Sequence, residues 1–91
     1  MDNNKDNNEE AIYYYKKGIE VGNKGDVKKA LEYFNKAIEL NPFYRDAYYN
    51  KALALRILGR YEEARECLII GMSIERYSNN KNNKKSEDNG K

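Results

Sequence analysis

The feature that most constrains this 91-residue chain is an internal repeat with a period of 34 residues. Shifted by that period, Tyr14-Tyr15 falls on Tyr48-Tyr49, and Gly25 falls on Gly59. Small residues stay small and bulky residues stay bulky along the rest of the match, with the pairs Ala30 and Ala64, Phe34 and Leu68, Ile38 and Met72, and Leu40 and Ile74. A repeat of this length indicates one supersecondary unit used twice, with the copies stacked to bury a shared core. The predicted units are residues 11–44 and 45–77.

Each unit is predicted to contain two helices. In the first unit Ile12, Tyr15 and Ile19 recur at helical spacing, after an expected cap at Asn8. Gly22 and Gly25 are expected to break that helix, and the remaining helices are expected at 27–40 (capped by Asp26), 46–58 and 61 to about 76. Asn41-Pro42 ends the second helix, since the residue before proline avoids the helical region. No segment alternates as a strand does, so the predicted fold class is all-α.

A 34-residue helix-turn-helix unit of this kind resembles the tetratricopeptide repeat family. The matching positions are Tyr14, Gly18, Val21, Ala30, Phe34 and Pro42 in the first unit, and Tyr48, Ala52, Leu55, Ala64 and Leu68 in the second. The sequence departs from the family pattern at Lys17, Lys51 and Arg76. The resemblance implies two repeats that form a fragment of an α-solenoid, and a function in binding other proteins.

Both ends of the chain are expected to be disordered. Residues 1–8 and 78–91 are rich in Asn, Lys, Asp and Ser, and the second segment has no apolar residue. Such segments bury too little surface to offset the entropy of ordering them. The predicted folded domain is therefore residues 9–77. The chain opens with no charged-then-apolar leader and has no apolar run of membrane length, so a cytoplasmic location is the default expectation.

The composition argues against catalysis and against cofactor or metal chemistry. The chain has no histidine, so the usual general base and metal ligand is absent. The single cysteine, Cys67, lies on the apolar side of its expected helix and is interpreted as a small core residue. The turns at Gly25-Asp26 and Gly59-Arg60 punctuate the repeats and do not form a phosphate-binding loop. We therefore expect a protein that is not an enzyme and that holds no cofactor or metal.

The charge balance argues against nucleic acid as the main partner. The 17 basic and 15 acidic residues give a net charge of +2, and the second helix of each unit carries several glutamates. A DNA-reading helix-turn-helix would use a shorter turn and a basic recognition helix. A nucleic-acid accessory that acts through the Lys-rich tail stays open as a weaker alternative to a solubilising role for that tail.

The resemblance also implies which surface binds a partner. In the family, the first helices of successive repeats line a concave groove that takes an extended peptide or a partner helix. Carried over to this sequence, the groove residues are Ile12, Tyr15, Ile19, Asn23, Tyr49, Asn50, Leu53, Arg56 and Ile57. Aromatic and arginine side chains are frequent anchors of interfaces, although each tyrosine could instead complete packing within the chain. The lysine and asparagine clamp that some family members use for chaperone tails is not expected, because Tyr15 and Ile19 stand at two of its positions.

The last helix predicts a second kind of contact. Ile69 and Ile70 fall outside the apolar arc of that helix, where the first unit has Asn35 and Lys36. An array normally ends in a polar capping helix, and the sequence offers none. Self-association into a symmetric dimer is therefore predicted, through Leu68, Ile69, Ile70 and Met72. The alternative is that these residues are tolerated on the surface. The two functional hypotheses are thus a peptide-binding adaptor and a structural unit that acts mainly through self-association.

Overall fold

The structure, a computed structural model, describes residues 6–90, and the side-chain surroundings of residues 6–80. Four helices follow one another as α1 (Asn7–Asn23), α2 (Val27–Leu40), α3 (Arg45–Ile57) and α4 (Tyr61–Gly90), with no strand among the described residues. The predicted all-α fold of two helical hairpins is confirmed.

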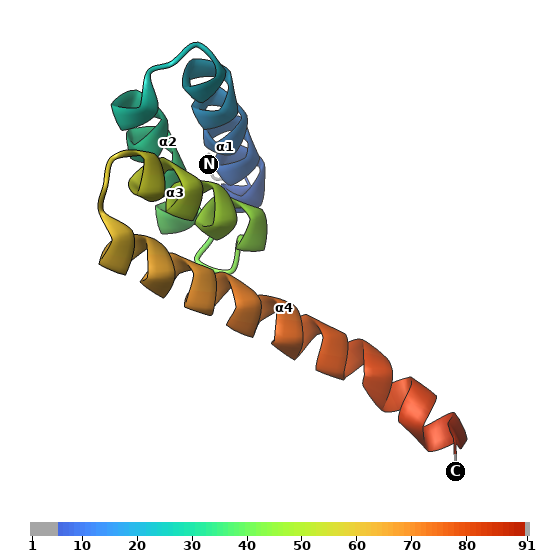
Figure 1. Cartoon of the computed structure of the whole chain (residues 1–91). Coiled ribbons are helices and arrows are strands. Elements are labelled where there is room, and N and C mark those ends of the chain that lie inside the picture. The colour runs from blue at the N-terminus through green and yellow to red at the C-terminus, as the bar shows by residue number, and fades with distance from the viewer. Residues whose placement is uncertain (1–5, 91) are drawn as a thin grey trace.

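The two hairpins stack side by side in the order of the chain. Helix α1 packs on α2, α3 packs on α4, and α2 packs on α3 to join the hairpins (Figure 1). The buried residues form two clusters, one centred on Leu55 with Leu31 and Ala64, the other on Ala11 with Ala37 and Ala47. This arrangement of neighbour contacts is that of a short α-solenoid.

Glycine in a left-handed conformation closes each hairpin. Gly25 has a φ of 97° and Gly59 a φ of 82°, a region that side chains make costly. After the first turn, the carboxylate of Asp26 accepts a hydrogen bond from the backbone N–H of Lys29 at 3.2 Å, which confirms Asp26 as the cap of α2. The predicted break at Gly22 is wrong, because α1 continues through Gly22 to Asn23. A single glycine weakens a helix without ending it.

Helix α1 begins earlier than the sequence suggested. Asp6 is the N-cap, and its side chain accepts a hydrogen bond from the N–H of Asn8. The predicted cap, Asn8, lies inside the helix and accepts a hydrogen bond at 2.9 Å from the amide of Asn41, at the end of α2. The predicted disordered segment 1–8 is therefore too long by residues 6–8, and residues 1–5 lie outside the described residues.

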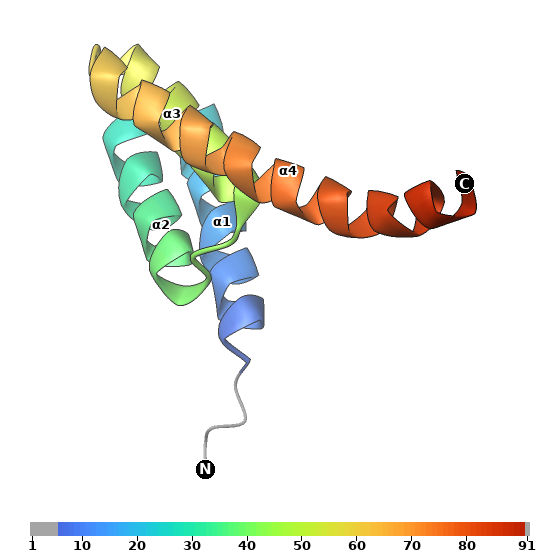
Figure 2. The ribbon, with the colours of Figure 1, turned by 90° about the horizontal axis from the view of Figure 1, so that it is seen from below.

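Helix α4 runs on to Gly90, beyond the predicted end near Arg76. The prediction placed the end of the helix where apolar residues cease. The loss of apolar residues removes packing against other helices, but it does not interrupt the helical hydrogen bonds of the backbone. No proline follows Arg76, and the next glycine is Gly90 itself. The extension projects away from the other three helices (Figure 1, Figure 2). The disorder expected for residues 78–91 stays a prediction that truncation can test.

Aromatic and small residues fit together at the centre of the first hairpin. Phe34 is buried, and a Cβ placed on Gly18 would lie 2.6 Å from its Cε1 atom. Cys67 is buried as predicted, and burial raises the pKa of its thiol. The position of Phe34 under Gly18 leaves the neighbouring surface of α1 hollow.

Candidate protein-binding groove

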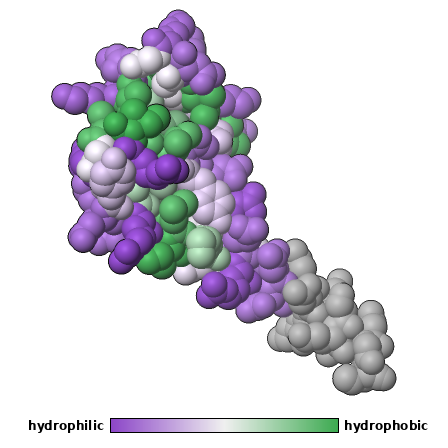
Figure 3. Space-filling view, in the orientation of Figure 1, coloured by the Kyte–Doolittle hydropathy of each residue, from purple (hydrophilic) through white to green (hydrophobic). Residues whose placement is uncertain are grey.

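An open hollow of about 220 Å³ lies between α1, α2 and α3. Its lining residues are Gly18, Ile19, Gly22, Asn23, Val27, Ala30, Phe34, Asn50, Leu53, Ala54 and Ile57. Apolar surface gathers in this region, between the α1–α2 hairpin and α3 (Figure 3). Because both hairpins contribute to it, the hollow exists only when they are stacked. We refer to it as the groove.

The local sequence explains why the surface is hollow. Gly18 and Gly22 stand one helical turn apart on α1 and contribute no side chain to the floor. A Cβ on Gly22 would already lie 3.3 Å from the Cβ of Ala30, so α1 and α2 approach closely there. At the α3 side, Leu53 is 50% exposed and Ile57 is 62% exposed. Small residues thus form the floor, and large aliphatic side chains stand at the rim.

The groove is apolar with two amide groups. Of the described residues that line it, Asn23 and Asn50 carry polar side chains, and none is charged. Such a surface favours an apolar side chain of a ligand, because burying it releases ordered water. The amides can in addition pair with backbone groups of an extended peptide.

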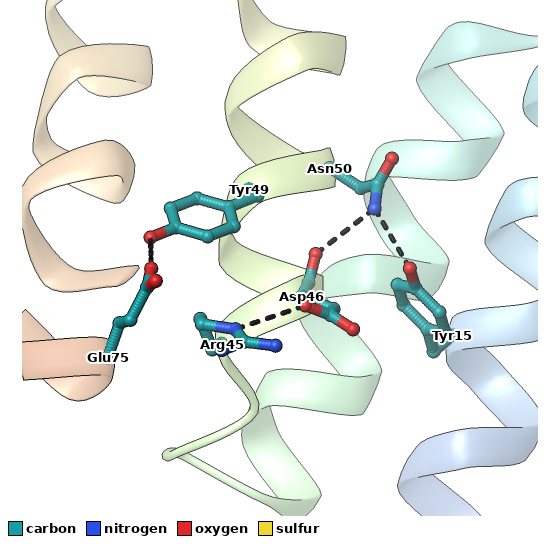
Figure 4. A network of polar contacts seen from close by, with 6 residues as sticks. All are labelled: Tyr15, Arg45, Asp46, Tyr49, Asn50 and Glu75. Atoms are coloured by element: carbon teal, nitrogen blue, oxygen red, sulfur yellow. Dashed lines mark hydrogen bonds and ion pairs between the residues drawn. The ribbon is translucent and has the colours of Figure 1, made fainter. Parts of the chain in front are cut away.

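A hydrogen-bond network fixes one end of the groove. The Asn50 amide donates to the Tyr15 hydroxyl at 3.0 Å and to the backbone carbonyl of Asp46 at 3.1 Å (Figure 4). The Tyr15 ring lies 5.0 Å from that of Tyr44 and 5.9 Å from that of Phe34, measured between centroids. Burial, followed by the nearby Asp46 carboxylate, raises the pKa of Tyr15 above its ordinary value. These contacts hold the first helices of the two repeats at a set distance.

Five of the nine predicted groove residues line the hollow; they are Ile19, Asn23, Asn50, Leu53 and Ile57. Tyr15 adjoins it through Asn50. Ile12 is half-buried on α1 and Arg56 is exposed on α3, and neither is among the lining residues.

Tyr49 points away from the groove, in contrast to its predicted position. Its hydroxyl donates to the Glu75 carboxylate of α4 at 2.7 Å (Figure 4). Its ring lies against Gly71, where an added Cβ would meet the Cε1 atom at 2.6 Å. Accordingly the hydrogen bond to Glu75 raises the pKa of Tyr49. The prediction missed this because the partner, Glu75, is 26 residues away in sequence.

The prediction also missed six lining residues, among them Gly18, Gly22 and Phe34. The signal for them was present in the sequence. Two glycines four residues apart on one helix leave a gap on its surface, and a large residue at Phe34 fills only part of it.

The residues predicted to self-associate lie on the outside of α4. Leu68 is 37% exposed, Ile69 54%, Ile70 42% and Met72 48%. The exposure of Ile69 and Ile70 agrees with their predicted place outside the apolar arc, whereas Leu68 and Met72 belong to that arc and are exposed as well. Apolar surface is visible on the part of α4 beneath α3 (Figure 3). What covers this surface stays a prediction.

The stacked hairpins and the groove define a helical-repeat protein of the kind that binds other proteins. The sequence model of the Tetratricopeptide repeat family matches residues 15–68, which is more than half of the chain, and the chain belongs to this family. The family generally serves as a non-enzymatic scaffold for protein interactions. Membership makes this chain a protein-interaction module.

Known proteins from several organisms resemble the chain, among them proteins of Methanocaldococcus jannaschii and Acaryochloris marina. An uncharacterised protein of Methanocaldococcus jannaschii is 74% identical over 76 residues, which cover 84% of this chain and 88% of that protein. A TPR repeat-containing protein of the same organism is 38% identical over 58 residues, and a photosystem I assembly protein of Acaryochloris marina is 37% identical over 59 residues. Each of these two alignments covers 64% of the chain, but only 18% and 36% of the respective relative. Among residues 6–90, no helix combines the length and the apolar character that a membrane crossing requires.

Proposed function

We propose that the chain is an adaptor whose groove binds one apolar side chain, with the adjacent backbone, from an extended peptide or a partner helix. The observation that supports this most directly is the uncharged hollow with Leu53 and Ile57 exposed at its rim. Exposed aliphatic side chains beside a preformed hollow gain free energy when a ligand covers them. A relative is named for the assembly of photosystem I, which is compatible with an adaptor role in the assembly of a complex.

The groove is suited to this role because it is formed by rigid parts of the fold. The floor is backbone and small side chains, and the Asn50–Tyr15 hydrogen bond ties the two first helices together. A preorganised site loses little entropy when it binds. The ligand that fits best carries a bulky aliphatic or aromatic side chain, flanked by backbone groups that reach Asn23 and Asn50.

Peptide selection with a matched control variant tests the proposal. Peptides selected from a random displayed library on the full chain are expected to share a bulky apolar residue. A Leu53→Ser/Ile57→Ser variant should weaken their binding by about tenfold or more, because it removes half-exposed apolar rim atoms. Phe43→Ser is the control, since Phe43 is 75% exposed but lies in the α2–α3 turn outside the groove.

Nuclear magnetic resonance locates the binding surface independently. Amide shifts on titration of a selected peptide should concentrate on residues 18–23 and 50–57. Equal binding by the rim variant, shifts confined to α4, or a selection that yields no binder would each contradict the groove proposal.

A further inference from the structure

Asn50, which lines the groove, presents only its oxygen to a ligand. Both hydrogens of its amide nitrogen are used within the chain, one in the 3.0 Å bond to the Tyr15 hydroxyl and one in the 3.1 Å bond to the Asp46 carbonyl. A backbone carbonyl can only accept a hydrogen bond, so the nitrogen must face Asp46, and this fixes the orientation of the amide. The Oδ1 atom points away from both contacts and has no donor among the described residues (Figure 4).

The Tyr15 hydroxyl beside this amide is a donor. Its oxygen accepts the hydrogen bond from Asn50, and its own proton has no acceptor in the described part of the chain. Because the pKa of Tyr15 is raised, the hydroxyl keeps that proton at neutral pH. The rings of Phe34 and Tyr44 pack against the Tyr15 ring and hold the hydroxyl in place. One acceptor and one donor therefore stand next to each other at the end of the groove.

This acceptor and donor match the backbone of an extended peptide. In a β-strand the N–H and C=O of one residue point to the same side, and an antiparallel partner exchanges two hydrogen bonds with them. Asn50 and Tyr15 offer the same two groups, an acceptor for the N–H and a donor for the C=O. When a strand is bound in this way, main-chain hydrogen bonds supply affinity and a pocket selects a side chain. The apolar hollow supplies that pocket.

A helix and a chain terminus fit this pair of groups less well. The N–H and C=O groups within an α-helix are bonded to one another, so the backbone of a helical ligand leaves Oδ1 of Asn50 without a donor. A C-terminal carboxylate offers only acceptors and would face Oδ1, with no cation among the described residues that line the groove. A polar group left without a partner costs binding free energy. An extended segment from within a chain avoids both defects.

We propose that the groove binds a segment of a partner protein in extended conformation, and that one residue of this segment pairs its N–H with Oδ1 of Asn50 and its C=O with the hydroxyl of Tyr15. The side chain of that residue or of a neighbour enters the apolar hollow. This inference rests on the groove proposal and specifies its ligand, which is an internal extended segment and not a helix or a chain end. Tyr15, which does not line the hollow itself, is then a residue that contacts the ligand.

Replacing single peptide bonds of a groove-selected peptide by esters tests the pairing, because an ester lacks the N–H and its carbonyl is a weaker acceptor. Fluorescence anisotropy with the full chain should show two adjacent sensitive positions. The ester that removes the N–H should weaken binding about tenfold, and the next ester, which weakens the C=O of the same residue, about threefold.

Protein variants assign each loss to one side chain. Asn50→Ala should abolish the penalty of the first ester, and Tyr15→Phe should abolish the penalty of the second, since the partner group is then absent. Asn23→Ala is the matched control, because it removes the other amide of the groove and should leave both penalties unchanged. Circular dichroism checks that each variant keeps its helices.

Transferred nuclear Overhauser effects report the backbone of the bound peptide directly. Strong contacts between Hα and the amide proton of the next residue are expected, whereas a series of contacts between neighbouring amide protons would show a bound helix and overturn the proposal. Ester penalties that persist in Asn50→Ala, no pair of sensitive positions, or tighter binding when the peptide is cut to end in a free carboxylate at the sensitive residue would also overturn it. If the peptide still depends on Leu53 and Ile57 in these cases, the groove proposal stands. A selection without binders, or peptides indifferent to Leu53→Ser/Ile57→Ser, would refute both proposals.

Discussion

Adding one methyl group at Gly18 should destabilise the first hairpin, even though alanine is the better helix former. In the structure a Cβ at this position would lie 2.6 Å from Cε1, 2.8 Å from Cδ1 and 3.0 Å from Cζ of Phe34. Phe34 is 3% exposed and cannot turn outward without leaving the core. The contact is therefore relieved only by moving α1 away from α2.

The expected magnitude follows from two opposing effects. Overpacking a well-filled core costs about 1–3 kcal/mol. Replacing a helical glycine by alanine returns about 0.5–1 kcal/mol. We expect Gly18→Ala to lower the free energy of unfolding by about 1–2 kcal/mol. In a domain of this size that corresponds to roughly 4–8 °C in the unfolding midpoint for each kcal/mol.

The second repeat supplies the compensating change. It carries alanine at position 52 and leucine at position 68, where the first repeat has Gly18 and Phe34. Phe34→Leu alone should cost about 1 kcal/mol, since it is a swap between apolar residues of similar size. Adding Gly18→Ala to Phe34→Leu should cost nothing further, because the shorter side chain leaves room for the methyl group.

Urea unfolding followed by far-ultraviolet circular dichroism measures all four members of this double-mutant cycle. The coupling free energy should reach about 1–2 kcal/mol in favour of the double variant. Strictly additive effects, or a Gly18→Ala variant more stable than the wild type, would show that the close approach to Phe34 does not limit the helix spacing.

Three further predictions concern the cap, the tyrosines and the C-terminal extension. Asp26→Ala should lower the free energy of unfolding by about 1 kcal/mol in the same assay, whereas Asp26→Asn should lower it much less, because asparagine also caps helices. Equal losses for the two variants would contradict the capping role. Burial raises the pKa values of Tyr15, Tyr44 and Tyr48 above their ordinary 10.0, so the unfolded chain loses these protons first. The contribution of these neutral tyrosines to stability is complete below pH 10.0 and is lost as the pH rises through their folded-state pKa values. Urea midpoints should therefore fall in alkaline buffer, and constant midpoints there would contradict the raised pKa values. Deleting residues 78–91 should leave the thermal midpoint within about 2 °C of the full chain, and a larger decrease would show that the extension stabilises the domain.

Local signals predicted the architecture well. Asp26 as a cap, glycine at both hairpin turns and the apolar spacing on α2 depend on neighbours in sequence, and the structure places them as expected. Two local predictions failed at α1, the break at Gly22 and the cap at Asn8. The other predictions that failed depended on distant contacts or on the missing stop of a helix. Tyr49 turns to α4 because Glu75 lies there, and α4 continues past Arg76 because nothing in its backbone interrupts it.

Only part of the groove was predicted, because the rest depends on contacts between helices. Rim residues such as Leu53 and Ile57 follow from their repeat positions on the first helices. Its floor depends on how closely α1 approaches α2, and this is set by Gly18, Gly22 and Ala30 together. The sequence of a single helix shows which side chains project from it. A cavity between two helices can be predicted only when the distance between those helices is known.

Tyr15 and Tyr49 occupy the same repeat position but have different neighbours. The hydroxyl of Tyr15 receives a hydrogen bond from the following repeat, whereas that of Tyr49 donates to the second helix of its own repeat. Because Tyr49 donates its proton to Glu75, its oxygen still has lone pairs that can accept a hydrogen bond. A third hairpin behind α4 could therefore bond to Tyr49 as Asn50 bonds to Tyr15, while Glu75 fixes the direction of the hydroxyl beforehand.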